Sequence, residues 1–406
     1  MSENSIAAKI VECDLLPTGG SLKEKTSLLN GIVELTYFES IRSPSISLKI
    51  NLIDVDGFIS TQGITGGEYI SLLIDTPDLG KFKITKKHGL MLNGVRNVIT
   101  NKNGERSDLE FVTVENIINE TARVTKRFDG SVDQIVEELL VSDTKGIQTK
   151  KKLDKDSAGN KYTFCGNLRR PIDTIQWLCP KTQRDAKSFG FLFWETLDGY
   201  EFKSIDGLLE QSPFKTFEKT ESSQPGDFRI FNTQFNQTND IGMNLRHGMY
   251  ATKTIYVDIE KGTKEIIDFN IKDVLKKPPV LPNNLQDKPT RLMYRLLDQG
   301  AMQKGSKPEE VQKPEELAKT QNKSYAKSNL LFAQSFTIVI PFDPNLRAGQ
   351  IVKIKMPVSD ESGNRTFSTK KEEDFNGEYL VSKLRHTINT KGSSSQLSLI
   401  RNVFTT

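Results

Sequence analysis

Apolar and polar residues alternate along much of the first 120 positions of the chain, as in β-strands with one buried face. The alternation is clear at residues 33–37 and 46–52, and glycine, asparagine and aspartate fill the breaks between such segments. This pattern predicts a β-domain over residues 1–120.

One strand pattern occurs twice, near the N-terminus and at the C-terminus. In each copy a glycine opens a strand, a second glycine opens another with an aromatic residue two positions on, and a strand of the form Leu-x-apolar-apolar closes the unit. The copies comprise residues 67–74, 80–86 and 109–114, and residues 349–356, 377–383 and 397–401. The match predicts two similar antiparallel β-barrel domains, although alternating strands also resemble one another by chance.

The spacing of apolar residues changes between residues 121 and 225, which we assign to an α+β middle domain. Apolar residues at 132–140 share one helical face, and a second helix is expected over 171–183, where Pro171 suits the first turn. The aromatic-rich run at 189–203 reads as a β-hairpin around a Leu-Asp-Gly turn. Residues 143–161 are rich in lysine and aspartate and are expected to form an exposed loop.

Strand signals return in residues 226–275, at 228–231, 253–257 and 266–269. We assign this region to strands that contribute to the second barrel and to an insertion.

Residues 276–333 are predicted to form a Pro- and Lys-rich linker with a helix. Within it, a short helical piece is expected over 291–299 and a longer helix over 309–332, interrupted at Pro314. The strand at 335–340 then begins the second barrel domain, which we assign to residues 334–406.

Composition indicates a soluble globular protein, with 36% hydrophobic and 27% charged residues. The net charge of +4 is a small difference between 56 basic and 52 acidic residues, so it gives no support for nucleic-acid binding. Cys13, Cys165 and Cys179 are an odd number at irregular spacing, which fits a reducing compartment such as the cytoplasm. No window reaches the roughly 18 apolar residues of a membrane span, and no signal peptide is recognisable.

Metal-ligating residues are sparse. His88, His247 and His386 lie far apart with no second histidine or cysteine at ligand spacing, which argues against zinc. We expect His88 and His386 to be polar residues at strand edges. The run Asp54-Val55-Asp56-Gly57 resembles the start of a calcium loop but lacks the third acidic residue and the distal glutamate, so a strand-ending turn is predicted.

Catalytic motifs are also missing from the sequence. It contains no glycine-rich nucleotide-binding motif and no Gly-x-Ser-x-Gly. Its carboxylate pairs and lysine runs are expected on solvated helix faces or loops: Glu137-Glu138, Glu309-Glu310, Glu315-Glu316, Glu372-Glu373, Lys150-Lys151-Lys152 and Lys276-Lys277. We therefore expect no catalytic, cofactor-binding or metal-binding residue, no enzyme activity and no cofactor, which favours a structural or assembly protein.

Three stretches carry a family resemblance. They are RPIDTIQWL at 170–178 followed by GFLFWE and DGYEF at 190–202, then NDIGMNLRHGMYATK at 239–253, and finally LRAGQIV at 346–352 with NGEYLV at 376–381 and the closing strand to Arg401. In these stretches the chain resembles the central baseplate hub protein of contractile-tailed bacteriophages of the T-even type. Relatives of that protein include the late-control tail proteins and the hub part of type VI secretion spikes.

The resemblance implies a homotrimer in which two tube-like β-barrels per subunit form a pseudo-sixfold ring. Such a ring adapts the six-fold tail tube to the three-fold central spike and leaves a channel for DNA. The implied partners are the spike protein, tail-tube or tube-initiator proteins and other baseplate proteins, and the implied location is the virion tail after synthesis in the bacterial cytoplasm. The resemblance offers no counterpart for residues 276–319.

Two other classes of function stay open at this point. One is a tail-associated peptidoglycan hydrolase, although no acid pair or Cys/His set supports it. The other is a β-module that binds carbohydrate or nucleic acid, and the near-neutral charge disfavours the nucleic-acid version.

Overall fold

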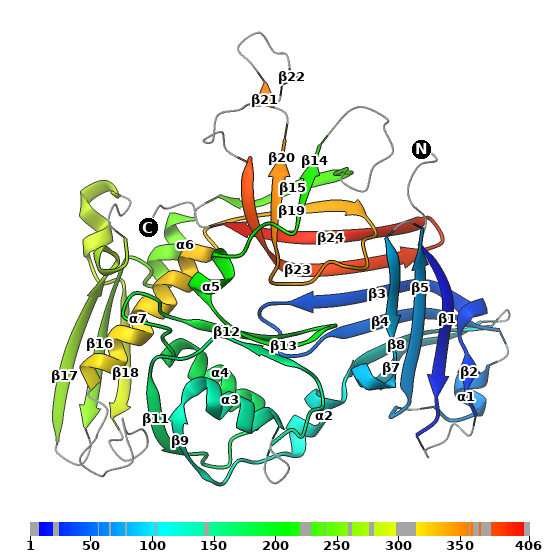
Figure 1. The fold of residues 1–406 in the computed structure, drawn as a ribbon, viewed down its shortest axis with the longest axis horizontal. Helices are drawn as coiled ribbons and strands as arrows, with labels where there is room; N and C mark the ends of the chain where they lie inside the picture. The colour runs from blue at the N-terminus through cyan, green and yellow to red at the C-terminus, as the bar shows by residue number, and fades with distance from the viewer. Residues whose placement is uncertain are drawn as a thin grey trace.

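Strands dominate the computed structural model (Figure 1). It describes residues 8–18, 24–55, 57–64, 66–77, 79–101, 104–141, 146–219, 229–238, 240–258, 262–275, 280–297, 314–356, 358–359, 365–366 and 375–401. Strand residues account for 49% and helical residues for 23%. The predicted class, mostly β with an α+β middle, is confirmed.

The first β-unit, coloured blue to cyan in Figure 1, is built from antiparallel strands with short helices in the connections. Its elements are β1 (Lys9–Leu16), β2 (Thr26–Ser27), η1 (Leu29–Gly31), β3 (Ile32–Ser40), β4 (Ser47–Asp54), α1 (Phe58–Thr61), β5 (Tyr69–Thr76), β6 (Gly80–Ile84), η2 (Lys86–His88), β7 (Leu90–Asn101) and β8 (Gly104–Thr113). The alternating residues of these strands bury one apolar face, which forms the core of the unit.

The second β-unit contains strands that lie far apart in the sequence. Its elements are β14 (Lys215–Glu218), β15 (Asn232–Thr238), β19 (Gln334–Pro341), β20 (Ile351–Lys355), β23 (Gly377–Asn389) and β24 (Gly392–Arg401), with the small ribbon β21 (Val358–Ser359) and β22 (Arg365–Thr366) beside them. The strand expected at 228–231 begins later, at Asn232.

The two β-units share one 14-stranded sheet, and the strand order in that sheet repeats. The part of the sheet from the second unit has the order β15-β19-β24-β23, with β20 next to β23. The part from the first unit has the corresponding order β3-β4-β8-β7, with β5 next to β7. β23 of the second unit pairs with β3 of the first, so the units stand in tandem (Figure 1). Every ladder along this path is antiparallel.

Backbone details repeat as well. Gly67 donates its N–H to the Leu92 carbonyl at 2.8 Å, and Gly349 donates to the Val381 carbonyl at the same distance. Both glycines have positive φ, 102° and 96°, which residues with a side chain rarely adopt. The glycine that opens each copy of the sequence pattern is therefore a requirement of the backbone.

The long hairpins β7–β8 and β23–β24 share one bulge and the register at the turn, whereas β7 has a second bulge between Arg96 and Ile99 that β23 lacks. A bulge follows Leu92 in β7 and Val381 in β23, and the last pairs before the turns are Asn101 with Gly104 and Asn389 with Gly392. One difference is that η2 interrupts the first unit between β6, which pairs with β5, and β7, whereas β23 is continuous. These matches support the predicted duplication.

The middle region packs two helices against small sheets. It comprises α2 (Val114–Thr121), β9 (Arg127–Ser131), α3 (Val132–Val141), β10 (Leu153–Lys155), β11 (Lys161–Cys165), α4 (Pro171–Leu178), η3 (Cys179–Lys181), β12 (Phe191–Thr196), β13 (Gly199–Ser204) and α5 (Ile205–Leu209). The predicted hairpin is β12–β13. The prediction of an exposed loop over 143–161 is wrong for residues 153–155, which form β10 and pair in parallel with β13.

The insertion between β15 and β19 lies at the left of Figure 1, and its last helix, α7 (Pro314–Leu331), packs against the middle region. Before α7 the insertion contains α6 (Ile241–Arg246), β16 (Ala251–Asp258), β17 (Thr263–Asn270), η4 (Ile271–Asp273), η5 (Pro282–Asp287) and β18 (Arg291–Leu297). β16 pairs with β17 and β18 in its own three-stranded sheet, so it does not join the second β-unit as expected. The helix expected over 291–299 is instead strand β18, and residues 276–279 and 298–313 lie outside the described part of the chain.

Candidate functional site: the junction between the β-units

The ladder between β23 and β3 joins the two β-units. It runs antiparallel from the pair Lys383 and Ser40 to the pair Asn389 and Glu34. The two strands are about 340 positions apart in the sequence, and their pairing makes one continuous sheet of the two units. This junction fixes how one unit is placed relative to the other.

His386 lies in the middle of this ladder, opposite Tyr37. Its ring is fully buried among Tyr37, Phe82 and Phe342, and its Nδ1 lies 2.8 Å from the Ser395 hydroxyl. The expectation of a strand-edge residue is therefore wrong for His386, because β3 covers that edge of β23.

The other two histidines lie elsewhere. His88 is in η2, where its Nδ1 accepts a hydrogen bond from the Thr85 amide at 2.9 Å, and His247 is exposed at the end of α6. The described residues hold no cluster of three or more histidine, cysteine, aspartate or glutamate side chains suited to a metal ion.

Stability is expected to depend on pH through His386. Burial lowers the pKa of this residue to about 3, and the Arg347 guanidinium adds to the effect. An unfolded histidine titrates near 6.5, so the unfolded chain takes up a proton over a pH range in which the folded chain does not. The free energy of unfolding should therefore fall by about 1.4 kcal/mol for each pH unit below roughly 6.5.

Denaturant titrations between pH 7 and pH 5 measure this loss. Between pH 6.5 and pH 5, we expect the free energy of unfolding of His386→Gln to fall by about 2 kcal/mol less than that of the parent. The exposed His247 provides the control, since His247→Gln should leave the slope unchanged. A slope that survives His386→Gln would show that other groups cause it.

Glu39 connects three parts of the chain from a fully buried position on β3. One carboxylate oxygen accepts hydrogen bonds from the Tyr37 hydroxyl at 2.7 Å and the Leu197 amide at 2.9 Å. The other accepts from the Ala348 amide at 2.8 Å. Leu197 belongs to the β12–β13 turn and Ala348 precedes β20, so one carboxylate ties the first unit to the middle region and to the second unit.

A second buried carboxylate, Glu195 on β12, binds the first unit. It accepts hydrogen bonds from the Ile46 amide at 3.1 Å and the Thr113 hydroxyl at 2.9 Å. The Lys151 Nζ lies 2.5 Å from a carboxylate oxygen of Glu195 and 2.7 Å from one of Glu115. The Lys151 side chain is only 9% exposed. The interpretation of Lys150–Lys152 as a solvated run is wrong for Lys151, which forms an ion-paired bridge inside the junction.

Apolar packing completes the junction. Trp194 donates its indole N–H to the Ala348 carbonyl at 3.1 Å, and a side chain at Gly349 would lie 2.5 Å from the Trp194 ring. Residues of the first unit, β12, α5, α7 and the second unit form one buried cluster here: Ile41, Trp194, Ile205, Leu208, Leu331, Ala348, Ile351, Leu380 and Ile400. The junction therefore combines a buried apolar cluster with buried carboxylates that accept hydrogen bonds.

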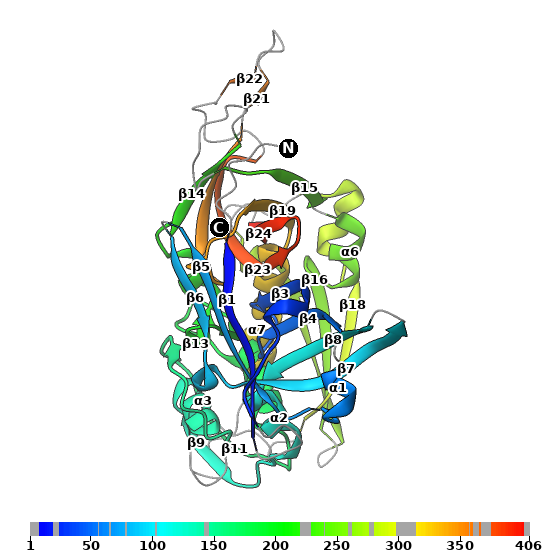
Figure 2. The same ribbon diagram turned by 90° about the vertical axis from the view of Figure 1, so that its right-hand side faces the viewer.

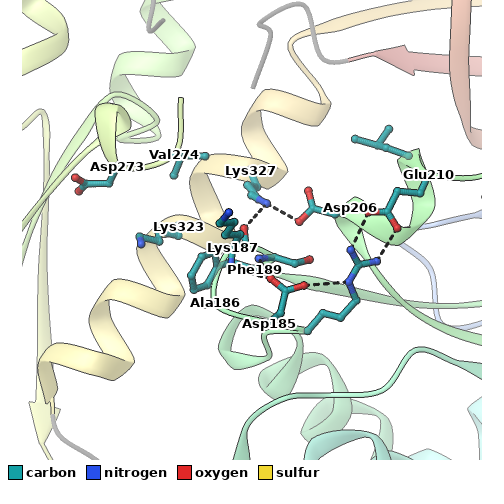
Figure 3. A pocket seen from close by; sticks show the side chains of 13 residues that line it. Asp185, Ala186, Lys187, Phe189, Asp206, Glu210, Asp273, Val274, Lys323 and Lys327 are labelled. Atoms are coloured by element: carbon teal, nitrogen blue, oxygen red, sulfur yellow. Dashed lines mark hydrogen bonds and ion pairs between the residues drawn. The ribbon is translucent and has the colours of Figure 1, made fainter. Parts of the chain in front are cut away.

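A cavity of about 620 Å³ lies beside the junction, between the middle region and α7 (Figure 3). Arg184 donates two hydrogen bonds of 2.8 Å to Glu210, and Lys327 of α7 binds Asp206 at 2.5 Å. Lys323 of α7 lies over the Phe189 ring, 4.7 Å from its centre. Most of these charges pair with one another, so the cavity wall mainly fastens α7 to the middle region.

The remaining candidates from the sequence do not converge on one site. Glu137 binds Lys155 and Glu138 binds Lys126, and the Asp54 carboxylate accepts from the Ile59 amide at 2.9 Å. Asp56, Lys276, Lys277, Glu309, Glu310, Glu372, Glu373 and the side chain of Glu315 lie outside the described residues. Among the helices that the structure describes, none is both long and apolar enough to cross a membrane.

Comparisons with known proteins identify the fold. No protein-family model and no curated protein matches the sequence. The structure is similar to the tail protein from Neisseria meningitidis MC58, with a TM-score of 0.55 and 11% identity over 98% of this chain and 97% of that one. It is also similar to the 43 kDa tail protein of prophage MuSo2 from Shewanella oneidensis, with a TM-score of 0.56 and 8% identity over 96% and 98%. The chain therefore has the fold of these tail proteins over nearly its whole length.

Proposed function

We propose that the protein is a structural hub of a phage-type tail baseplate and assembles as a homotrimeric ring. The tandem repeat of β-units in one sheet carries the proposal. Two similar units in each chain give three chains six similar surfaces, so a three-fold ring can match a six-fold neighbour. The fold shared with two tail proteins supports the tail as the setting.

In this proposal the ring acts through its geometry. One side binds tail-tube or tube-initiator proteins, the other binds the three-fold spike, and other baseplate proteins surround it in the virion tail. The buried bridges of Glu39 and Glu195 suit this role, because they hold both units and the middle region in one fixed arrangement. No residue is assigned a catalytic or cofactor-binding part.

The sheet face opposite the core suits the wall of a channel for DNA. Charged side chains on this face are paired across strands, as in Lys49 with Asp108 at 2.9 Å and Arg96 with Glu110 at 2.6 Å. Paired charges present little net charge, so a passing polyanion would be neither held nor repelled strongly. We propose that this face lines the channel.

Light scattering after size-exclusion chromatography tests the assembly directly. The proposal expects a species with three times the 45.7 kDa mass of one chain, and electron microscopy should show six similar lobes around an opening. A monomer or dimer at every concentration would contradict self-assembly into a ring.

A further inference from the structure

Two strands of the repeat, β7 and β15, have an open edge that corresponds to an edge paired in the β23–β3 junction. β23 uses its outer edge to pair with β3, and by strand order β7 corresponds to β23 and β15 to β3. Within the described residues, β7 pairs with β5 only at Met91, and β15 pairs only with β19. We propose that β7 of one copy pairs with β15 of the next, in the register of the β23–β3 junction.

This inference rests on the proposed ring and specifies its interface. Four strands make up the repeated stretch and every ladder in it is antiparallel, so β7 and β15 would also meet in antiparallel orientation. Three copies joined in this way close the sheet on itself. The β7 and β15 edges are then covered in every copy, which removes the aggregation hazard that these two open edges carry.

The register follows from shared irregularities of the two hairpins. Leu92 corresponds to Val381 at the bulge, and Asn101 corresponds to Asn389 at the turn. β7 has a second bulge between Arg96 and Ile99 that β23 lacks, so the register beyond it is counted back from the turn. Counted in this way, Ile99 corresponds to Thr387.

The matching position on β15 is found through β19 and β24. Phe336 of β19 faces Leu399 of β24, and Leu48 of β4 faces Phe111 of β8. Leu399 and Phe111 are the partners of Val381 and Leu92 at the two bulges, so Phe336 corresponds to Leu48. One position beyond Phe336, Thr337 pairs with Gln234 of β15. One position beyond Leu48, Lys49 pairs with Thr36 of β3. Gln234 of β15 therefore corresponds to Thr36 of β3. Because Thr387 pairs with Thr36 inside the chain, Ile99 should pair with Gln234 of the next copy.

Side-chain exposure agrees with a missing partner at β7. Val98 is 49% and Ile99 54% exposed at this edge, although both are large and apolar. In the matching stretch of β23 the edge is covered by β3, and His386 is fully buried against Tyr37 of β3 and the rings of Phe82 and Phe342. Figure 2 shows β7 and β8 extending beyond the rest of the molecule, where a neighbouring copy can reach them. A second copy of the chain is thus the occupant that the repeat itself specifies.

Disulfide trapping tests the register. In a Cys165→Ser background, which removes the exposed cysteine, the double variant Ile99→Cys with Gln234→Cys is oxidised under mild conditions. Directly opposite residues of an antiparallel pair bring their Cβ atoms to about 4.5–5.5 Å, close enough for a disulfide after slight adjustment. We expect bands at the sizes of two and three chains on a non-reducing gel.

Two matched variants make the result specific. Ile99→Cys with Thr233→Cys moves one cysteine by a single residue to the opposite face of β15 and should not form these bands. Thr36→Cys with Thr387→Cys reproduces the same pair inside the chain and should form a disulfide without any covalent oligomer.

The outcomes separate the interface from the ring. Trimers in light scattering without cross-linking of the 99/234 pair would overturn the β7–β15 interface and leave the ring intact. Equal cross-linking of the 99/234 and 99/233 pairs would indicate random collisions and overturn the register. Monomers without cross-links would overturn both the interface and the proposed function.

Discussion

Replacing Lys151 with methionine is expected to lower the free energy of unfolding by about 3–5 kcal/mol at pH 8. The ammonium of Lys151 lies between the carboxylates of Glu115 and Glu195, whose side chains are 7% and 0% exposed. Methionine has a similar volume but no charge, so the variant leaves two buried carboxylates without their counter-ion. Breaking a buried ion pair from one side costs far more than the pair contributes as a whole.

The size of this loss should depend on pH. Burial raises the pKa of Glu195 to about 7 even with Lys151 beside it. Without the lysine, this pKa rises further, so the carboxyl can take up a proton near neutral pH and escape the unpaired charge. A group whose pKa is higher when folded stabilises the fold more as the pH falls, so the variant should recover part of its stability between pH 8 and pH 6.

Lys152→Met provides the matched control. Lys152 is the next residue in the chain and is exposed, so its loss should change stability by less than about 0.5 kcal/mol. Denaturant unfolding of the two variants and the parent at pH 8 and pH 6 measures the contrast. Equal effects of the two substitutions would mean that the buried bridge contributes nothing to stability.

The duplicated β-units could be predicted from the sequence because their signals are local. A glycine at the start of a strand and an alternating run after it depend on backbone geometry that Gly67 and Gly349 share. The hairpin β12–β13 was predicted for the same reason, since its turn is specified by adjacent residues. The pairing of β23 with β3 depends on strands far apart in the chain, and no local pattern indicates it.

Strand β18 shows how tertiary pairing overrides a local pattern. The helix predicted over 291–299 is compatible with the local spacing, since Leu292, Met293, Leu296 and Leu297 would share one helical face. In the structure this segment lies parallel to β16, and its residues alternate between a half-buried and an exposed face. Pairing with β16 decides the conformation, because strand preference depends strongly on neighbours.

The junction residues were missed although the sequence contains a signal for them. Glu39 continues the inward-facing series of Leu35 and Tyr37, and His386 lies between Leu384 and Ile388 in the same way. A polar side chain on the apolar face of a predicted strand must find a buried partner, so it marks a contact with another part of the fold. The partner itself could not be predicted, since it comes from a distant segment in each case.

Glu39→Ala is expected to lower the free energy of unfolding by about 4 kcal/mol, because each buried donor left without an acceptor costs roughly 1–3 kcal/mol. The Tyr37 hydroxyl and the amides of Leu197 and Ala348 lose their acceptor in this variant. The damage should centre on the contacts between the β-units. Hydrogen exchange at the Leu197 and Ala348 amides is therefore expected to accelerate more than exchange in the strand interiors of either unit.

Glu34→Ala serves as the control, because Glu34 lies on the same strand but its side chain is 41% exposed. Its carboxylate pairs with Arg385 at 3.7 Å and accepts a hydrogen bond from the Thr36 hydroxyl at 3.2 Å. Exposed ion pairs of this kind contribute about 0–1 kcal/mol, so stability and exchange should change little. Uniform acceleration of exchange in Glu39→Ala would point to a general loss of stability. Local acceleration at Leu197 and Ala348 alone would show that this carboxylate holds the units together. Such a variant should also assemble less well, since the proposed ring requires both units of each chain at a fixed angle.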